Sequence, residues 1–179
     1  MADYYKNIDK YCEPLVGLYN SVLQVTTSSE GSEPVTVEEA KSWGKIEQDY
    51  DDDLIEELIT AAREDLEGFT GLGFITRSLV VGINNADGGF NLPYGPIITG
   101  PSAVDTDGNT LDLTFNLGQI EEPRGRMTVS YTGGYATLPK KFKTALKQQI
   151  LFLYENRGES SIGLSPIAES LLRRYRVVV

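Results

Sequence analysis

The period of the apolar residues changes along this chain, and that change limits the folds open to it. From Leu54 to Phe69, apolar side chains recur every three or four residues. This spacing predicts an amphipathic helix of about four to five turns. The sequence TGLG at residues 70–73 predicts where the helix ends. Asp53 and Glu56, three residues apart at its start, form a capping-box signature.

The next segment, residues 74–132, has a different character. It contains short β-branched or alternating stretches separated by turn sequences such as NNADGG and DTDGN. Helical spacing returns after Pro139, a residue suited to a first helical position, and Gly158 is the expected stop. Ser165 and Pro166 then open a short last helix. These patterns predict an α+β fold, a small bundle of about four to five helices with an inserted antiparallel β subdomain.

Two domain segments are expected. Residues 1–34 form an N-terminal arm and linker, because roughly helical spacing interrupted at Pro14 is followed by the loop-favouring sequence TTSSEGSEP. Residues 35–179 form the main domain, which opens with a short helix capped by Thr36 and Glu39 and ends in the tail 173–179. The tail YRVVV is prone to form a strand, either in its own sheet or by addition to a partner.

Composition excludes several classes of function. The chain has 179 residues, no histidine and a single cysteine, Cys12, so no Ser-His-Asp or Cys-His catalysis, no histidine-based zinc site and no internal disulfide is expected. The net charge of −10 opposes nonspecific binding to nucleic acid. No apolar run approaches the length of a membrane span and no signal peptide is visible, so a cytoplasmic origin without membrane insertion is expected.

The charges are unevenly distributed. Fourteen acids and three bases lie between Glu30 and Glu67, whereas eight bases and three acids lie between Pro139 and the end. These two regions are complementary, and they could meet within one subunit or between neighbouring copies. The candidate inter-subunit contacts are Asp51, Asp52 and Glu56 on the acidic side and Lys141, Lys143 and Lys147 on the basic side.

The run EQDYDDDLIEELI at residues 47–59 is the densest cluster of carboxylates. A calcium loop starting at Asp49 would need glycine at its sixth position and glutamate at its twelfth, but Leu54 and Thr60 occupy them. Catalysis would need carboxylates in apolar surroundings, which this polar segment does not indicate. The favoured interpretation is a helix N-terminus with surplus acids, with weak cation binding and catalysis as alternatives. No catalytic residue, metal ligand or cofactor site is predicted.

The order of these motifs resembles the head-tail connector, or adaptor, family of tailed bacteriophages. The resemblance spans about residues 35–176, from VTVEEAKSWGKI through DDDLIEELITAAREDLEGFTG, VSYTGGYATLP and KFKTALKQQILFLYENRGE to PIAESLLRRYR. The residues that carry it are Thr36, Glu39, Ala40, Asp52, Asp53, Leu54, Leu58, Ile59, Ala61, Ala62, Glu67, Thr70, Gly71, Tyr131, Gly134, Pro139, Tyr154, Arg157, Leu172, Tyr175 and Arg176. The arm at 1–34 departs from the family pattern.

The resemblance implies a structural virion protein in the neck at the head-tail interface, assembled in the host cytoplasm. Such proteins form a ring, usually of twelve subunits, below the portal, extend the DNA channel without sequence-specific binding, and receive a stopper or tail-completion protein. They are not enzymes. Their C-terminal segment engages the portal, which corresponds here to Arg173, Arg174, Tyr175, Arg176, Val177, Val178 and Val179.

Other functions remain open. The first is another packaging or tail component, such as a small terminase subunit, a tail terminator or a tail-completion protein. The absence of a helix-turn-helix pattern and of a basic DNA-binding patch weighs against the terminase version. The second alternative is a metal-dependent enzyme. The acids of its active site would need to come from separate elements of the fold, whereas most of the acids here lie in one segment.

Overall fold

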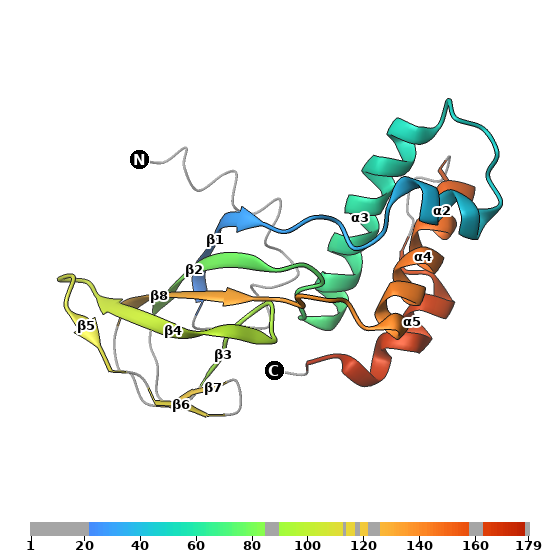
Figure 1. The fold of residues 1–179 in the computed structure, drawn as a ribbon. Helices are drawn as coiled ribbons and strands as arrows, with labels where there is room; N and C mark the ends of the chain where they lie inside the picture. Colours follow the sequence, from blue (N-terminus) through green and yellow to red (C-terminus); the bar gives the residue numbers. More distant parts are fainter. Residues whose placement is uncertain are drawn as a thin grey trace.

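The chain places a helical part and a β-sheet part end to end (Figure 1). The computed structural model describes residues 22–84, 90–112, 114–116, 119–121, 126–157 and 163–177. Four α-helices and a five-stranded antiparallel sheet lie within these ranges. The predicted α+β fold is therefore confirmed. In the described part of the chain, no helix combines the length and the hydropathy that a membrane span requires.

The helical part is built on two long helices. These are α3 (Asp52–Thr70) and α4 (Lys140–Glu155), which pack against each other. The short helix α2 (Val37–Gly44) packs on both, and α5 (Pro166–Leu172) packs on α4 before the 3₁₀ turn η2 (Arg173–Tyr175). The apolar stripe predicted for α3 faces the interior, where Ile55, Ile59, Ala62 and Leu66 are buried.

Helix ends agree with the sequence in part. The Thr36 hydroxyl caps α2 by accepting the backbone N–H of Glu39 at 3.3 Å, and Gly71 ends α3 in the left-handed conformation at φ 72°. The predicted capping role of Asp53 is wrong, because α3 begins at Asp52 and has no side-chain cap. Pro139 is the cap residue of α4 rather than its first helical residue.

The end of α4 also differs from the expectation. The helix ends at Glu155, before the predicted stop at Gly158, which lies outside the described residues. Asn156 is the cap, and its side-chain amide donates to the carbonyl oxygen of Phe152 at 2.7 Å. A side-chain hydrogen bond to the last turn thus takes part in ending this helix.

The main sheet has the strand order β1-β2-β8-β4-β5, with every pair antiparallel. Its strands are β1 (Val22–Glu30), β2 (Arg77–Asn84), β4 (Ile97–Asp105), β5 (Thr110–Leu111) and β8 (Arg126–Gly133). A second, three-stranded sheet contains β3 (Phe90–Asn91), β6 (Thr114–Asn116) and β7 (Gln119–Glu121). Because β2 to β8 lie between α3 and α4 in the sequence, the predicted β insertion is present.

The segment before α2 corrects one expectation. Residues 26–30 were predicted as part of a linker, but they belong to β1, which pairs with β2 from Val22 to Glu30. The Ser and Thr residues that favour loops are tolerated because β1 is an edge strand of the sheet, with register shifts on either side of Gln24 to Thr27. Residues 1–21 lie outside the described residues, and the division at residue 34 stays a prediction.

The interior consists of two hydrophobic clusters. One lies among the helices and includes Ile59, Leu66, Phe142 and Leu146, with Phe74 added from the chain that leaves α3. The other covers one face of the sheet, from Leu79, Val81 and Ile83 on β2 to Met127, Val129 and Tyr131 on β8. The alternate residues of these strands point to the same face, as the period of two requires.

The two parts of the molecule are joined through a tight backbone crossing. Gly134 donates its N–H to the carbonyl oxygen of Pro96 at 2.9 Å, and the N–H of Tyr135 donates to Gly73 at 3.0 Å. Gly134 has φ 98°, and a Cβ at this position would overlap the backbone oxygen of Ile75. Only glycine fits both the conformation and the space.

The substitution Gly134→Ala should therefore lower the free energy of unfolding by about 3 kcal/mol or more, a large effect for a single methyl group. Gly108 is a matched control, because it has φ 85° but open space around its Cα. Gly108→Ala should cost only about 1–2 kcal/mol, the strain of the left-handed conformation. Urea unfolding followed by circular dichroism measures both. Equal losses would show that the crossing does not depend on the missing Cβ.

Candidate functional site: a buried ionic junction and two charged surfaces

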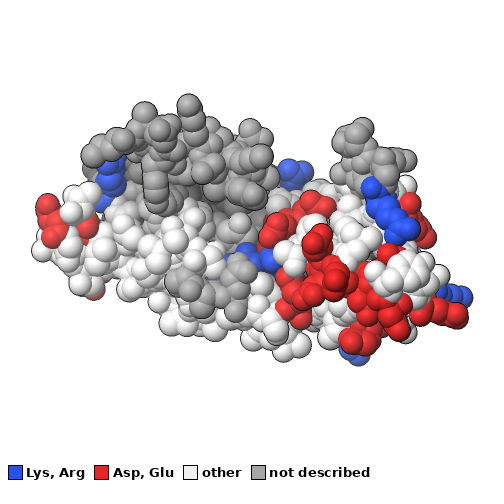
Figure 2. All heavy atoms as spheres, turned by 90° about the horizontal axis from the view of Figure 1, so that it is seen from above, with Lys and Arg blue, Asp and Glu red and all other residues white. Residues whose placement is uncertain are grey.

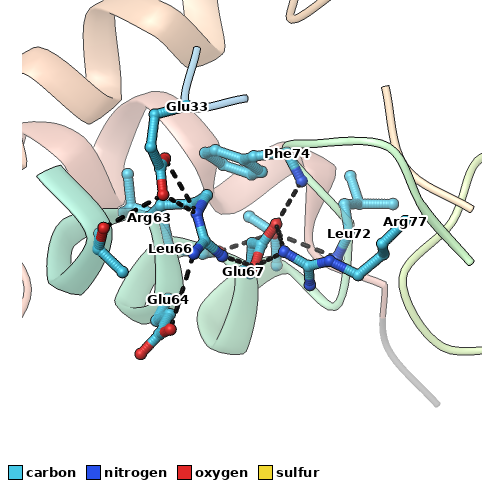
Figure 3. Close-up of polar contacts among 10 residues, drawn as sticks. Glu33, Arg63, Glu64, Leu66, Glu67, Leu72, Phe74 and Arg77 are labelled. Atoms are coloured by element: carbon cyan, nitrogen blue, oxygen red, sulfur yellow. Dashed lines mark hydrogen bonds and ion pairs between the residues drawn. The ribbon is translucent and has the colours of Figure 1, made fainter. Parts of the chain in front are cut away.

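A buried ionic cluster lies where α3 passes into the sheet (Figure 3). The Glu67 carboxylate is only 3% exposed and lies between Arg63 and Arg77, at 2.9 Å and 3.0 Å. Its other oxygen accepts the backbone N–H of Phe74 at 2.6 Å. Arg63 in turn binds Glu33 at 2.9 Å. We call Glu33, Arg63, Glu67 and Arg77 the ionic junction.

The ionic junction connects three segments that are distant in the sequence. Glu33 comes from the stretch between β1 and α2, Arg63 and Glu67 come from α3, and Arg77 is the first residue of β2. Arg77 also stacks over the Tyr94 ring at 4.8 Å. Each charge therefore fixes the position of a different piece of backbone, which gives the junction a structural role.

The protonation of the junction depends on competing effects. Burial raises the pKa of Glu67 above its ordinary value, and the charges of Arg77 and Arg63 and the Phe74 amide only partly offset this rise. Burial alone would lower the pKa of Arg63. The carboxylates of Glu67 and Glu33 have the larger combined effect, so the pKa of Arg63 is raised. Because both arginines are within hydrogen-bond distance of Glu67, the geometry favours a charged carboxylate that serves as a clamp rather than as a proton donor.

The carboxylates of the run 47–59 have several separate partners. Lys41 binds Asp49 at 2.6 Å and Asp52 at 2.7 Å. Asp51 accepts the Tyr154 hydroxyl at 2.6 Å and lies 3.5 Å from Arg157. Within the described residues, no group of three or more His, Cys, Asp or Glu side chains is placed to hold a metal ion.

The basic residues of α4 also have contacts inside the subunit. Lys143 binds Glu39 at 2.7 Å, and this hydrogen bond lowers the pKa of the Glu39 carboxyl. Lys147 lies 5.8 Å from the Trp43 ring, and Lys141 lies 5.1 Å from the Tyr175 ring. The acidic and basic regions of the sequence therefore meet partly within one subunit. Of the six candidate inter-subunit residues, Glu56 and Lys141 are exposed, and the inter-subunit role of all six stays a prediction.

The C-terminal candidate residues lie at the far end of the helical part from the acidic run. Arg173 and Arg174 are exposed on η2. Tyr175 packs on Phe142 with ring centroids 5.0 Å apart, and the N–H of Val177 donates to Thr70 at 2.9 Å. The described residues of the tail form no strand, so the expected strand in the subunit's own sheet is wrong up to Val177, and strand addition to a partner stays a prediction. Val178 and Val179 lie outside the described residues.

A cavity of about 380 Å³ opens beside the ionic junction. Two loops, residues 31–34 and 135–138, line it together with Phe74 to Thr76 and Lys143. Its two charged side chains are already engaged, Glu33 with Arg63 and Lys143 with Glu39. The cavity therefore presents no charged group that is set apart for chemistry.

Sequence reasoning missed the ionic junction. At the level of the sequence, Arg63 and Glu67 enter the charge balance of residues 30–67 and no contact between them is predicted, whereas both are buried and paired. A signal was present, since Arg63 and Glu67 are four residues apart and follow Ile59 on the apolar side of the helix. Local spacing does not identify Arg77 as a partner of Glu67, because only the turn after α3 brings the two residues together.

Comparison with known proteins fits this architecture. Residues 34–99, which contain α2, α3, β2 and β3, match the family model described as phage gp6-like head-tail connector protein. The predicted resemblance to head-tail connectors is confirmed. The match covers the acidic run and three of the four residues of the ionic junction, Arg63, Glu67 and Arg77, and begins one residue after Glu33. No curated protein gives a significant match to the chain.

Solved structures of low sequence identity share the fold over nearly their whole length. A chain in the neck of an empty gene transfer agent (GTA) particle, computed with C6 symmetry, is 18% identical with TM-score 0.69, covering 88% of this chain and 97% of that chain. A chain in the virion of the native GTA particle has TM-score 0.68 and 18% identity. A chain in the native neck, computed with C12 symmetry, has TM-score 0.63 and 20% identity. The alignments with these two chains also cover 88% of this chain and 97% of the matched chain. At this identity the likeness concerns the fold.

The substitution Glu67→Gln should destabilise the protein by about 3 kcal/mol, because it leaves two buried arginines without their shared counter-charge. In a chain of this size, that loss lowers Tm by about 6–12 °C. Glu64→Gln, on the same helix but with a side chain 63% exposed, should change the stability by less than about 1 kcal/mol. Thermal unfolding by calorimetry compares the two, and a Glu67→Gln variant as stable as the Glu64→Gln control would contradict the clamp.

Proposed function

We propose that this chain is a structural subunit of a phage-type head-tail connector, located in the neck of the virion and assembled in the host cytoplasm. The observation that carries the proposal is the fold shared with a neck chain over 97% of that chain, together with the connector family match at residues 34–99. A rigid scaffold joined by a buried ionic clamp fits a structural role, and connector proteins are not enzymes.

The proposal includes a ring, twelve subunits in the finer version, placed below the portal. The related necks were computed with C6 and C12 symmetry, which supports a rotational arrangement for this chain. A ring of identical subunits needs two different faces on each subunit that fit each other. The predicted contact residues, Asp51, Asp52 and Glu56 with Lys141, Lys143 and Lys147, supply opposite charges for these faces.

We propose that the C-terminal segment Arg173–Val179 contacts the portal. Two features of the structure support this role. Arg173 and Arg174 are exposed, and Tyr175 and Val177 anchor the segment to the body, so the arginines are presented from a fixed base. The opposite face would receive the stopper or the tail-completion protein, and the ring would extend the DNA channel. An excess of acids, with a net charge of −10, would let DNA pass without adhering.

The portal contact can be tested without unfolding the tail. The variant Arg173→Ser/Arg174→Ser removes two exposed charges and keeps the packed Tyr175. We expect it to bind portal at least about tenfold more weakly in a pull-down, because an interface that desolvates two arginines depends on them. The control Lys45→Ser/Arg126→Ser removes two exposed charges elsewhere. Portal binding by Arg173→Ser/Arg174→Ser as strong as that of the wild type would contradict the proposed portal contact.

The ring itself is tested by imaging. Negative-stain microscopy of the chain mixed with the portal should show a ring stacked on the portal with matching rotational symmetry. Particles in which the portal stays bare at saturating concentrations of the chain would refute the connector proposal.

A further inference from the structure

Two groups of exposed charges lie toward opposite ends of the helical part of the subunit. The first is an acidic surface on the α2–α3 turn and the outer face of α3. The second is a basic surface on the first turn of α4 and at the residue that follows η2. The acidic surface consists of Glu47, Tyr50, Asp53, Glu56 and Glu57; the basic surface consists of Lys140, Lys141 and Arg176.

The acidic surface has the composition of a docking face. Asp53, Glu56 and Glu57 follow each other at helical spacing on the side of α3 opposite the buried Ile55 and Ile59. Figure 2, which looks at the molecule from above the view of Figure 1, shows acidic side chains gathered over the helical end. The ring of Tyr50 is 81% exposed beside them, and an exposed aromatic within a charged patch is typical of an interface anchor.

The basic surface is held together by contacts between its elements. Lys141 lies 5.1 Å from the Tyr175 ring, and Arg176 lies 5.5 Å from the ring of Phe69 in the last turn of α3. Its position is unfavourable for the isolated subunit, because the first turn of α4 contains lysines and no acid to complement the positive end of the helix dipole. Positive charges at the N-terminus of a helix are destabilising unless a negative group lies nearby.

Within the described residues, Lys143 of this turn is paired with Glu39, whereas Lys140, Lys141 and Arg176 form no ion pair with an acid of their own subunit. The acidic surface extends along α3 to Glu57 and the basic surface contacts Phe69 in the last turn, so about 18 Å of helix separates them. At physiological salt the screening length is about 8 Å, so the two surfaces do not attract each other within one molecule. In the acidic run 47–59, the acids with ion-pair partners inside the subunit are Asp49, Asp51 and Asp52, and none of the three belongs to the acidic surface.

We infer that the acidic surface of one subunit docks on the basic surface of a second copy of this chain, in a head-to-tail contact. The contact is heterologous, because the two surfaces differ, and Tyr50 packs at its centre. This assignment deepens the proposed connector function, on which it rests for the biological setting. It keeps Glu56 and Lys141 from the predicted contacts and adds Lys140 and Arg176. It leaves out Asp51, Asp52 and Lys143, which have ion pairs inside the subunit, and Lys147, which lies near the Trp43 ring.

Charge reversal and mixing test the contact. One variant, Glu56→Lys/Glu57→Lys, makes the acidic surface basic; the other, Lys140→Glu/Lys141→Glu, makes the basic surface acidic and leaves residues 173–179 intact. Each variant alone presents two surfaces of like charge. When the two variants are mixed, each contact between one variant and the other joins surfaces of opposite charge, so the two variants should assemble in alternation.

Sedimentation velocity at low salt provides the readout. Wild type should self-associate with increasing concentration and less so at high salt, each variant alone should associate about tenfold more weakly or not at all, and the equimolar mixture should recover the association. Asp107→Lys/Asp112→Lys makes the same change in net charge as Glu56→Lys/Glu57→Lys, at two exposed residues on either side of β5, and should leave association unchanged. The lysine reversal places acids at a helix N-terminus, so its Tm should not fall.

Two outcomes would overturn the inference: wild type that stays monomeric at every concentration and salt tested, or a mixture that does not recover association. The result is separable from the connector proposal. Association restored in the mixture without portal binding would count against the connector function and leave this contact standing. Wild type that binds portal but never itself would overturn the contact alone.

Discussion

The Glu67 carboxylate is the point on which the arrangement of the two parts depends. One buried side chain accepts hydrogen bonds from an arginine on its own helix, from the first residue of β2 and from the backbone of Phe74. Burying such a group is costly unless every partner is in place. The chain that leaves α3 therefore has little freedom to turn in another direction, and the sheet is held at a fixed angle to the helices.

This rigidity fits the way the rest of the subunit is built. The helical cluster and the sheet cluster are separate hydrophobic interiors, and the connection between them consists of the ionic junction and the glycine crossing at Gly134. A subunit made of two small interiors would otherwise flex at the connection. In a connector ring, where each copy must repeat the same contact, a fixed angle between the parts is what allows the ring to close.

The pattern of charge follows from the same packing. Charges that the fold brings close together are paired inside the subunit, as in Lys41 with Asp49 and Lys143 with Glu39. Charges that α3 keeps apart stay exposed at its two ends. The acidic run is therefore divided into two sets of residues. Part of it stabilises the junction between α2, α3 and α4, and part of it remains available to another molecule.

The sequence by itself determined the periodic elements. The stripe from Leu54 to Phe69, the stop at Gly71, the cap at Thr36 and the β insertion follow from local spacing and backbone preference. Tertiary structure decided the rest, because it depends on contacts between distant residues. Only folding pairs residues 26–30 with β2, buries Arg63 and Glu67 in a clamp with Arg77, and packs Tyr175 onto Phe142. Local rules identify a face of a helix, but they do not identify what that face will meet.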